Sequence, residues 1–306
     1  MELNHIYTGD ALKTLRQFPS ESVDCVVTSP PYYCLRDYGV AGQIGLEQTP
    51  EQFIKRLTEV FIACKRVLKK TGTMWIVIGD SYAGSGRGWG DINRKGIQQK
   101  ASFANEFSKP KNLRNYKNKD LIGIPWQLAF SLRKNGLYLR QDIIWHKPNP
   151  MPESVRDRCT KSHEYIFLLT KSLKYHFDSV AIQTDNLGNA HDKSARKGRK
   201  THPTEFINGI RISGGYYPKA NKRDVWTVCT APEKEAHFAC FPQALIVDCI
   251  KAGCPENGTV LDPFMGSGTT AVVARKLNRN YIGFELNPNY MKIAKAKLKR
   301  ELGFFV

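Results

Sequence analysis

The sequence is poor in acidic residues relative to basic ones, and it lacks a long apolar run. Its 306 residues include 46 Lys and Arg against 28 Asp and Glu, a formal net charge of +18. A surplus of this size favours a polyanionic partner, most simply nucleic acid, over a merely solvated basic surface. No apolar run approaches the ~20 residues that span a bilayer, and residues 1–10 lack the apolar core of a signal peptide. We therefore expect a cytoplasmic protein with no membrane partner.

The chain also lacks any Cys-x-x-Cys pair among its eight cysteines. In a chain long enough to bury a large core, such cysteines are expected to be reduced thiols rather than disulfides. The one set that invites a zinc interpretation is His237, Cys240, Cys249 and Cys254, and its spacing matches no structural zinc pattern. We therefore expect no metal site.

Hydrophobic periodicity predicts alternating strands and helices. A short apolar run at 24–28 predicts a buried strand, the helical spacing over 50–68 predicts a helix, and 74–78 predicts the next strand after a break at Gly72. Strand, helix and strand in succession make a βαβ unit, which requires a parallel sheet. Similar patterns predict helices at 124–134, 242–252, 269–277 and 288–302, and strands at 139–145, 164–169, 259–262 and 281–285. The predicted fold class is α/β, with a doubly wound, mostly parallel sheet.

Two long stretches are rich in Lys and Arg and have no sustained periodicity. The stretch 83–120 is expected to be a flap that touches DNA, or else a mobile surface insertion. The stretch 185–223 interleaves basic residues with Tyr216 and Tyr217, which suits phosphate contact and base stacking but also a charged surface loop. The residues expected to bind DNA are Arg87, Arg94, Lys95, Lys197, Arg199, Lys200, Arg211, Lys222 and Arg223.

The segment 262–270, Asp-Pro-Phe-Met-Gly-Ser-Gly-Thr-Thr, leads from an apolar strand into a helix. Its glycines allow close approach of the backbone to a ligand, and a helix N-terminus offers free N–H groups to a carboxylate. Glu285 ends the next predicted strand, about 20 residues after the glycine turn. In nucleotide-binding units an acidic residue at this spacing binds the ribose hydroxyls. A NAD site is the plain alternative, but the turn lacks the third glycine of that fingerprint. The segment therefore predicts a loop that binds a methyl donor.

Ser29-Pro30-Pro31-Tyr32 directly follows the first predicted strand, where α/β sheets bind ligands. An exocyclic amino group of a base is a poor nucleophile because its lone pair is delocalised into the ring. Ser29 Oγ and the Pro30 carbonyl oxygen can accept its two hydrogens and free the lone pair for attack on a methyl group. The prolines fix the backbone, and Tyr32 can stack on a base withdrawn from the duplex. In isolation the motif is equally typical of a proline-rich turn, whereas beside a donor loop it predicts amino-group methylation.

Together these segments resemble the DNA amino-methyltransferases that use S-adenosylmethionine, over nearly the whole chain. The catalytic motif comes first, a basic variable region follows and the donor loop comes last, an order similar to the circularly permuted beta class with its Rossmann-like fold. The segment 9–11 resembles the family segment beside the cofactor adenine, and 237–242 resembles the one that closes over the donor. The resemblance implies S-adenosyl-L-methionine as the cofactor, bound by Asp10, Ala11, Phe241, Pro242, Asp262, Phe264, Gly266, Ser267, Gly268, Thr269, Thr270 and Glu285. It implies Ser29, Pro30, Pro31 and Tyr32 as the catalytic residues.

Segments 144–150 and 163–165 also match family segments, between the catalytic motif and the recognition region. We expect residues 1–170 to form the catalytic half of the methyltransferase domain, including the mobile basic loop. Residues 171–225 are expected to form the target-recognition region, and residues 226–306 the half that binds S-adenosyl-L-methionine.

In this family, Ser at the first position of the motif resembles the cytosine-N4 version, whereas Asp or Asn usually marks adenine N6. We expect a site-specific methyltransferase acting on cytosine N4 in double-stranded DNA, with adenine N6 as the alternative. An RNA methyltransferase and a non-catalytic DNA-binding module stay open as further alternatives, because a fold alone does not determine the substrate. A cognate restriction endonuclease is a potential partner. The sequence identifies neither the DNA site that is recognised nor the oligomeric state, monomer or homodimer.

Overall fold

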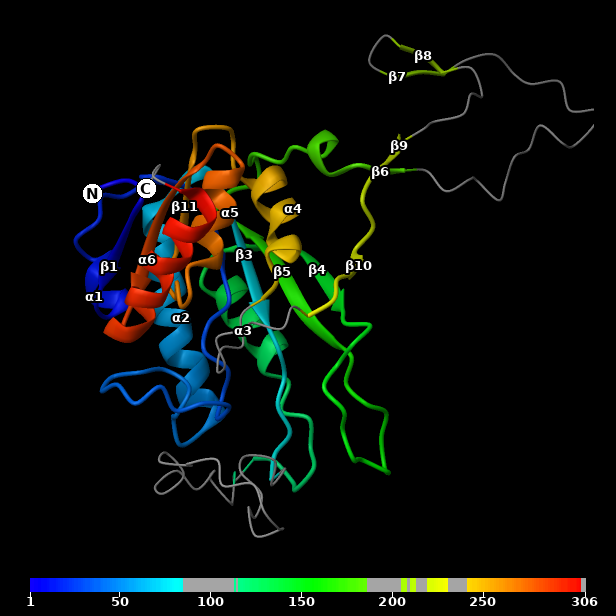
Figure 1. The fold of residues 1–306 in the computed structure, drawn as a ribbon. Coiled ribbons are helices and arrows are strands. Elements are labelled where there is room, and N and C mark those ends of the chain that lie inside the picture. Colours follow the sequence, from blue (N-terminus) through cyan, green and yellow to red (C-terminus); the bar gives the residue numbers. More distant parts are fainter. Residues whose placement is uncertain are drawn as a thin grey trace, which may run out of the picture.

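A computed structural model describes residues 1–84, 113, 115–185, 219–230 and 241–303, and the backbone of 205–207 and 210–212 (Figure 1). One eight-stranded sheet has the order β1-β12-β11-β2-β3-β5-β4-β10. Its strands are β1 (His5–Thr8), β2 (Val23–Thr28), β3 (Leu68–Ile78), β4 (Tyr138–His146), β5 (His163–Thr170), β10 (Val225–Thr227), β11 (Thr259–Asp262) and β12 (Asn280–Glu285). Only β5 runs antiparallel to its neighbours among these described strands, which confirms the mostly parallel sheet.

Helices cover both faces of the sheet. The helices α1 (Ala11–Leu15), α2 (Pro50–Val67) and α3 (Ile124–Lys134) pack on one face, and α4 (Gln243–Gly253), α5 (Thr269–Lys276) and α6 (Pro288–Leu302) pack on the other. Strand β2 shows how: Val26 belongs to the first core cluster, whereas Cys25 and Val27 belong to the second. A strand buried on both faces gives the continuous apolar run seen in the sequence.

Short elements complete the described chain. The 3-10 helix η1 covers Val180–Ile182, β6 (Thr184–Asp185) pairs with β9 (Lys219–Ala220), and β7 (Glu205–Ile207) pairs with β8 (Ile210–Ile212). Among the described residues, none of the helices combines the length and the apolar character that a membrane span requires.

Local sequence explains where the long helices begin. The Thr49 hydroxyl accepts from the Gln52 N–H at 3.3 Å, and Pro50 occupies the first helical position, so α2 begins where the sequence predicts. The observed bounds of α3 and α6 equal the predicted ones. By contrast, β1, α1 and β10 were not predicted, because each is too short to show a period.

Gly72 does not separate a helix from a strand, so that part of the prediction was wrong. Strand β3 begins at Leu68, directly after α2, and includes Gly72. A Cβ on Gly72 would lie 2.5 Å from Leu68 Cδ1 and 2.8 Å from the Asp24 carbonyl oxygen. The β2–β3 register also shifts between Val23 and Cys25. The glycine therefore permits an irregularity inside the pairing instead of ending an element.

The chain leaves two neighbouring central strands toward opposite faces of the sheet. Strand β11 leads into α5 on one face, and β2 leads toward α2 on the other. Because β1, β12, β11 and β2 are parallel, their carboxyl ends meet at one edge. The crevice at such a switch point is where open α/β sheets bind ligands.

Candidate active site

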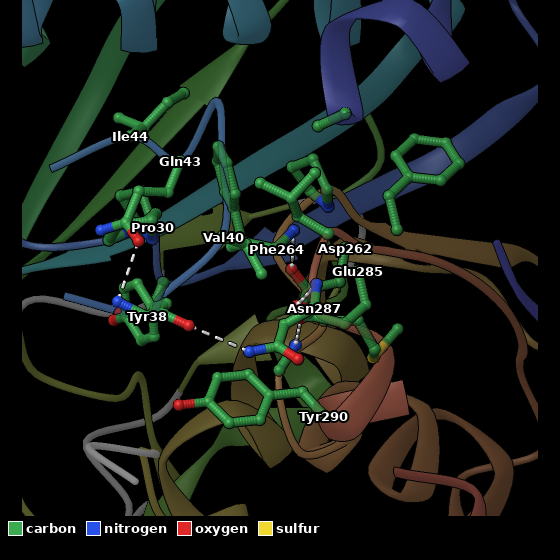
Figure 2. Close-up of a pocket in the computed structure, with 18 of the residues that line it drawn as sticks. Pro30, Tyr38, Val40, Gln43, Ile44, Asp262, Phe264, Glu285, Asn287 and Tyr290 are labelled. Atoms are coloured by element: carbon green, nitrogen blue, oxygen red, sulfur yellow. Dashed lines mark hydrogen bonds between the residues drawn. The ribbon is translucent and has the colours of Figure 1, made fainter. Parts of the chain in front are cut away.

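A pocket lies at the carboxyl ends of β1, β12, β11 and β2, and Figure 2 shows part of its lining. It brings together segments from the two ends of the chain. The sequence-predicted residues that line it are Asp10, Ala11, Ser29, Pro30, Pro31, Tyr32, Phe241, Asp262, Phe264, Gly266, Ser267, Thr269 and Glu285. Three further predicted residues lie at its borders: Pro242 precedes α4, Gly268 precedes α5, and Thr270 contacts Asp262. The Ser-Pro-Pro-Tyr motif and the glycine turn thus face the same pocket.

Asp262 joins the two halves of this pocket. Its buried carboxylate accepts hydrogen bonds from the hydroxyls of Thr28 and Thr270, each at 2.6 Å, and from the Phe264 N–H at 3.0 Å. Burial raises the pKa of Asp262 to about 6 despite these donors. Since Thr28 immediately precedes Ser29, the carboxyl ties the glycine turn to the strand that leads into the Ser-Pro-Pro-Tyr segment.

Glu285 organises the backbone of the glycine turn. Its Oε2 accepts from the Gly266 N–H at 2.8 Å, and its Oε1 accepts from the Asn287 N–H at 2.7 Å. The Glu285 carbonyl oxygen accepts from the Gly9 N–H at 2.9 Å, which brings β1 to the same corner. Burial raises the pKa of this carboxyl above its ordinary value. The Glu285 carboxylate thus links the glycine turn after β11 to the start of α6, while its backbone carbonyl links the end of β12 to the residue that follows β1.

A lysine ammonium, that of Lys297, lies next to the N-terminus of α5. Gly268, at φ +83°, precedes the helix, and within the described chain no side chain caps it. The buried Lys297 ammonium, which comes from α6, donates to Thr269 Oγ1 at 3.0 Å and to Ser267 Oγ at 3.4 Å. A helix N-terminus and a nearby cation both favour an anionic group. Sequence reasoning missed Lys297, since it sits among other lysines on α6.

A loop between the Ser-Pro-Pro-Tyr segment and α2 forms a further wall of the pocket that the sequence did not predict. Asn287 Nδ2 donates to the Tyr38 carbonyl oxygen at 3.1 Å, and the Tyr38 N–H donates to Gln43 Oε1 at 2.9 Å. The rings of Tyr38 and Tyr290, two residues labelled in Figure 2, pack edge to face. Their ring centroids are 5.9 Å apart. A signal for Asn287 was present in the sequence, because the Asn-Pro pair just after Glu285 is typical of a helix start, which Asn caps.

Tyr32 is anchored away from the glycine turn. Its hydroxyl donates to Glu164 Oε2 at 2.5 Å, and Lys147 forms an ion pair with the same carboxylate. Burial raises the pKa of the Tyr32 phenol well above its ordinary value, so the phenol is a neutral donor.

The predicted DNA-binding residues fall mostly outside the described structure: Arg87, Arg94, Lys95, Lys197, Arg199 and Lys200. Arg211 is described only by its backbone in β8. Arg223 is exposed, whereas Lys222 forms an ion pair with Asp248 and its ammonium lies 4.6 Å from the Trp226 ring centroid. The ammonium of Lys222 therefore already has an anionic partner in the fold. DNA contact by these residues stays a prediction.

The base of the first basic stretch is closed by backbone hydrogen bonds. Tyr82 forms an isolated antiparallel bridge with Leu121, and the Ala83 N–H donates to the Asp120 carbonyl oxygen at 2.8 Å. Residues 85–112 and 114, where the flap was predicted, lie outside the described residues. So do His237 and Cys240, while Cys249 and Cys254 are buried in the core.

A family model of DNA methylases, of the N6 and N4 type, matches residues 23–296. The chain belongs to the N6/N4 DNA methylase family. It is an S-adenosylmethionine-dependent DNA amino-methyltransferase of this class, with a Rossmann-like α/β fold.

Curated relatives of this methyltransferase cover almost its entire length. It is 45% identical over 303 residues to the Type II methyltransferase M.Cfr9I of Citrobacter freundii, covering 98% of this chain and 90% of the relative. It is 44% identical over 295 residues to the Type II methyltransferase M.SmaI of Serratia marcescens, covering 96% and 90%.

Solved structures share the fold of this methyltransferase. The PvuII DNA methyltransferase, which is cytosine-N4-specific, aligns with a TM-score of 0.63 at 17% identity, covering 95% of this chain and 84% of that one. A DNA modification methylase of Thermus thermophilus, in complex with S-adenosyl-L-methionine, aligns with a TM-score of 0.61 at 23% identity, covering 98% and 95%. At these identities the structures support the fold alone.

Proposed function

We propose that this enzyme methylates the exocyclic N4 of cytosine in duplex DNA, at a specific site. The observation that carries the proposal is Ser29, which lines the pocket immediately after β2, in the same cavity as the glycine turn. A serine hydroxyl is a neutral acceptor at the position where Asp or Asn usually accompanies adenine N6. Adenine N6 stays the second candidate, because both bases present an amino group with two hydrogens.

The pocket suits the cofactor of the family. S-Adenosyl-L-methionine, when bound, supplies a methyl group on a sulfonium centre that a weak nucleophile can attack. Glu285 would hold the ribose hydroxyls, and the N-terminus of α5 with Lys297 behind it would hold the carboxylate. Asp10, Ala11 and Phe264 would surround the remainder.

The catalytic motif would act on the amino group of a base withdrawn from the duplex. Ser29 Oγ and the Pro30 carbonyl oxygen would each accept one amino hydrogen, which turns the nitrogen lone pair toward the methyl group. Tyr32 would stack on the base. Positioning supplies most of the acceleration in such a site, because the residues present fixed acceptors before the reaction begins.

Product analysis tests the assignment of the base. The enzyme would be incubated with duplex DNA, and separately with RNA, together with donor carrying a labelled methyl group, and each nucleic acid then digested to nucleosides. We expect N4-methylcytosine. Labelled N6-methyladenine would favour the second candidate, preferential labelling of RNA would favour an RNA methyltransferase, and the absence of any labelled base would exclude all three.

The variant Ser29→Ala identifies the role of the hydroxyl. It removes one acceptor from the amino group, so we expect kcat to fall about 100-fold or more. Donor affinity, measured by calorimetry, should stay close to that of the wild type, since Glu285 and Lys297 hold the glycine turn. Activity equal to that of the wild type would contradict a catalytic role for Ser29. If both proteins gave only background labelling, the alternative of a non-catalytic DNA-binding module would be revived.

We further propose that the enzyme modifies DNA alongside a cognate restriction endonuclease, as the Type II names of its relatives suggest. Methylated plasmid should then resist cleavage by an endonuclease of the same host. Cleavage at an unchanged rate by every such endonuclease would contradict this partnership.

A further inference from the structure

A polar cluster of Glu164 and Lys147 lies next to Tyr32, at the ends of β5 and β4, the strands that follow β3 in the sheet order. Glu164 comes from the start of β5, and Lys147 directly follows β4. Tyr32 Oη donates to Glu164 Oε2 at 2.5 Å, and Lys147 Nζ pairs with Glu164 Oε1. The Lys147 and Glu164 side chains are only 17% and 13% exposed. The carboxylate thus holds the phenol with one oxygen and its counter-ion with the other, largely out of water.

The ammonium of Lys147 is itself held in place. It lies 4.3 Å from the centroid of the Trp145 ring, a cation–π contact. Nearby, Lys161 donates to the Asp80 carbonyl oxygen at 2.8 Å, and its charge also faces Glu164. The Glu164 carboxyl therefore lies between the Tyr32 phenol and two lysine side chains.

Gly79 makes room for this contact. It directly follows β3 and its backbone has no positive φ, so conformation alone does not require glycine. A Cβ at Gly79 would lie 2.9 Å from Tyr32 Cε2 and 3.2 Å from Glu164 Cδ. The ends of β3 and β5 therefore form a slot that fits the Tyr32 ring and the Glu164 carboxyl together.

We propose that Glu164, supported by Lys147, is a positioning residue that fixes the ring plane of Tyr32 for methyl transfer. A tyrosine attached only through its Cβ can turn about two side-chain torsions, whereas a hydrogen bond at the far end of the ring restricts both. A fixed ring gives the extruded base one stacked position, with its amino group at Ser29 and the Pro30 carbonyl. The inference rests on the proposed function, in which Tyr32 is the stacking surface.

The pair is tested by a double-mutant cycle of Tyr32→Phe and Glu164→Ala. Each single variant should lower kcat about tenfold, because a small misplacement of a reactant is costly. Glu164→Ala should cause much less loss of kcat in the Tyr32→Phe background than in the wild type, since the Tyr32–Glu164 hydrogen bond is already absent there. Glu164→Gln keeps an acceptor and should recover part of the activity. Glu301→Gln, which alters an ion-paired carboxylate on α6, is the matched control and should leave kcat unchanged.

A fluorescent analogue of the base that the product analysis finds labelled, placed at the target position, supplies a readout that a purely structural role would not change. Stacking on Tyr32 should quench its emission in the wild-type complex, and the quenching should weaken in Tyr32→Phe and Glu164→Ala at unchanged DNA occupancy. Additive losses of kcat, wild-type kcat in Glu164→Ala, or unchanged quenching would each overturn the proposal. The kinetic cycle is measured with whichever base the product analysis finds labelled, so its failure is distinct from failure of the cytosine assignment.

Discussion

At the scale of single residues, Asp262 shows how a buried carboxyl can join two functional segments at an energetic cost. Three donors satisfy its oxygens, yet removal from water still outweighs them and raises its pKa to about 6. The folded protein therefore holds the Asp262 proton more tightly than the unfolded chain, where the pKa of an aspartate is about 3.9. Its contribution to stability should then depend on pH in the direction opposite to that of a salt-bridged aspartate.

We predict that the stability contribution of Asp262 is present below about pH 4 and is lost as the pH rises to about 6. A shift of about two units corresponds to roughly 3 kcal/mol of unfolding free energy. The measurement is denaturant unfolding of the wild type and Asp262→Asn at pH 4 and pH 7. From pH 4 to pH 7, the unfolding free energy of Asp262→Asn should rise relative to that of the wild type by roughly that amount.

The difference between the two proteins is the control, because all other titrating groups are common to both. A difference that stays constant with pH, or that changes in the opposite direction, would contradict the assignment of the raised pKa to Asp262.

At the scale of elements, the glycine turn depends on a close contact between helices as well as on backbone conformation. Gly268 has φ +83°, and a Cβ there would lie 3.0 Å from the Ala294 Cβ of α6. Gly42 has the same φ of +83°, but a Cβ there would have no atom of the described residues within 4 Å. The two glycines share the conformational requirement and differ in the steric one.

We predict that Gly268→Ala lowers the unfolding free energy by about 3 kcal/mol and Gly42→Ala by about 1 kcal/mol. The first value adds crowding against α6 to the cost of a left-handed alanine, and the second includes only that cost. Chemical denaturation of both variants measures the difference. Equal losses would show that α6 shifts freely, and that its contact does not set the shape of the turn.

The elements also show which parts of the fold could be predicted. The helices α2, α3 and α6 were predicted to within a residue because periodicity and Pro or Asn at their starts are local signals. The strand β1 and helix α1 were missed because four and five residues show no period. Gly72 was misinterpreted because the reason for a glycine there is steric. A Cβ at this position would clash with Leu68 and with the Asp24 backbone, and these neighbours come close only when β2 and β3 pair.

At the scale of the whole molecule, the net charge and the order of the basic stretches along the chain bear on how the protein binds DNA. The net charge of +18 belongs to a chain with two basic stretches, 83–120 and 185–223. Neutralising phosphates with Lys and Arg releases counterions from DNA, and this makes affinity fall with salt.

We predict that the affinity for duplex DNA falls about 100-fold or more between roughly 50 and 200 mM salt, the response expected for several phosphate contacts. Fluorescence anisotropy with a labelled duplex measures it. The affinity for S-adenosyl-L-methionine, measured by calorimetry over the same range, is the control and should change far less. An affinity for DNA that does not depend on salt would contradict phosphate contact by the basic stretches.

Local sequence was sufficient to predict most elements and the glycine turn, because capping, periodicity and left-handed glycines depend on residues close in the chain. It also predicted that the Ser-Pro-Pro-Tyr segment directly follows a strand, whereas the catalytic role of that segment stays a prediction. Local sequence could not specify that Tyr32 would meet Glu164, that Lys297 would stand behind the turn, or that Asn287 would hold the loop at Tyr38. Those contacts exist because parallel pairing places β12, β11 and β2 side by side, while antiparallel β5 adds its end beyond β3. The order of strands depends on burying both faces of one sheet at once, which is a property of the entire chain.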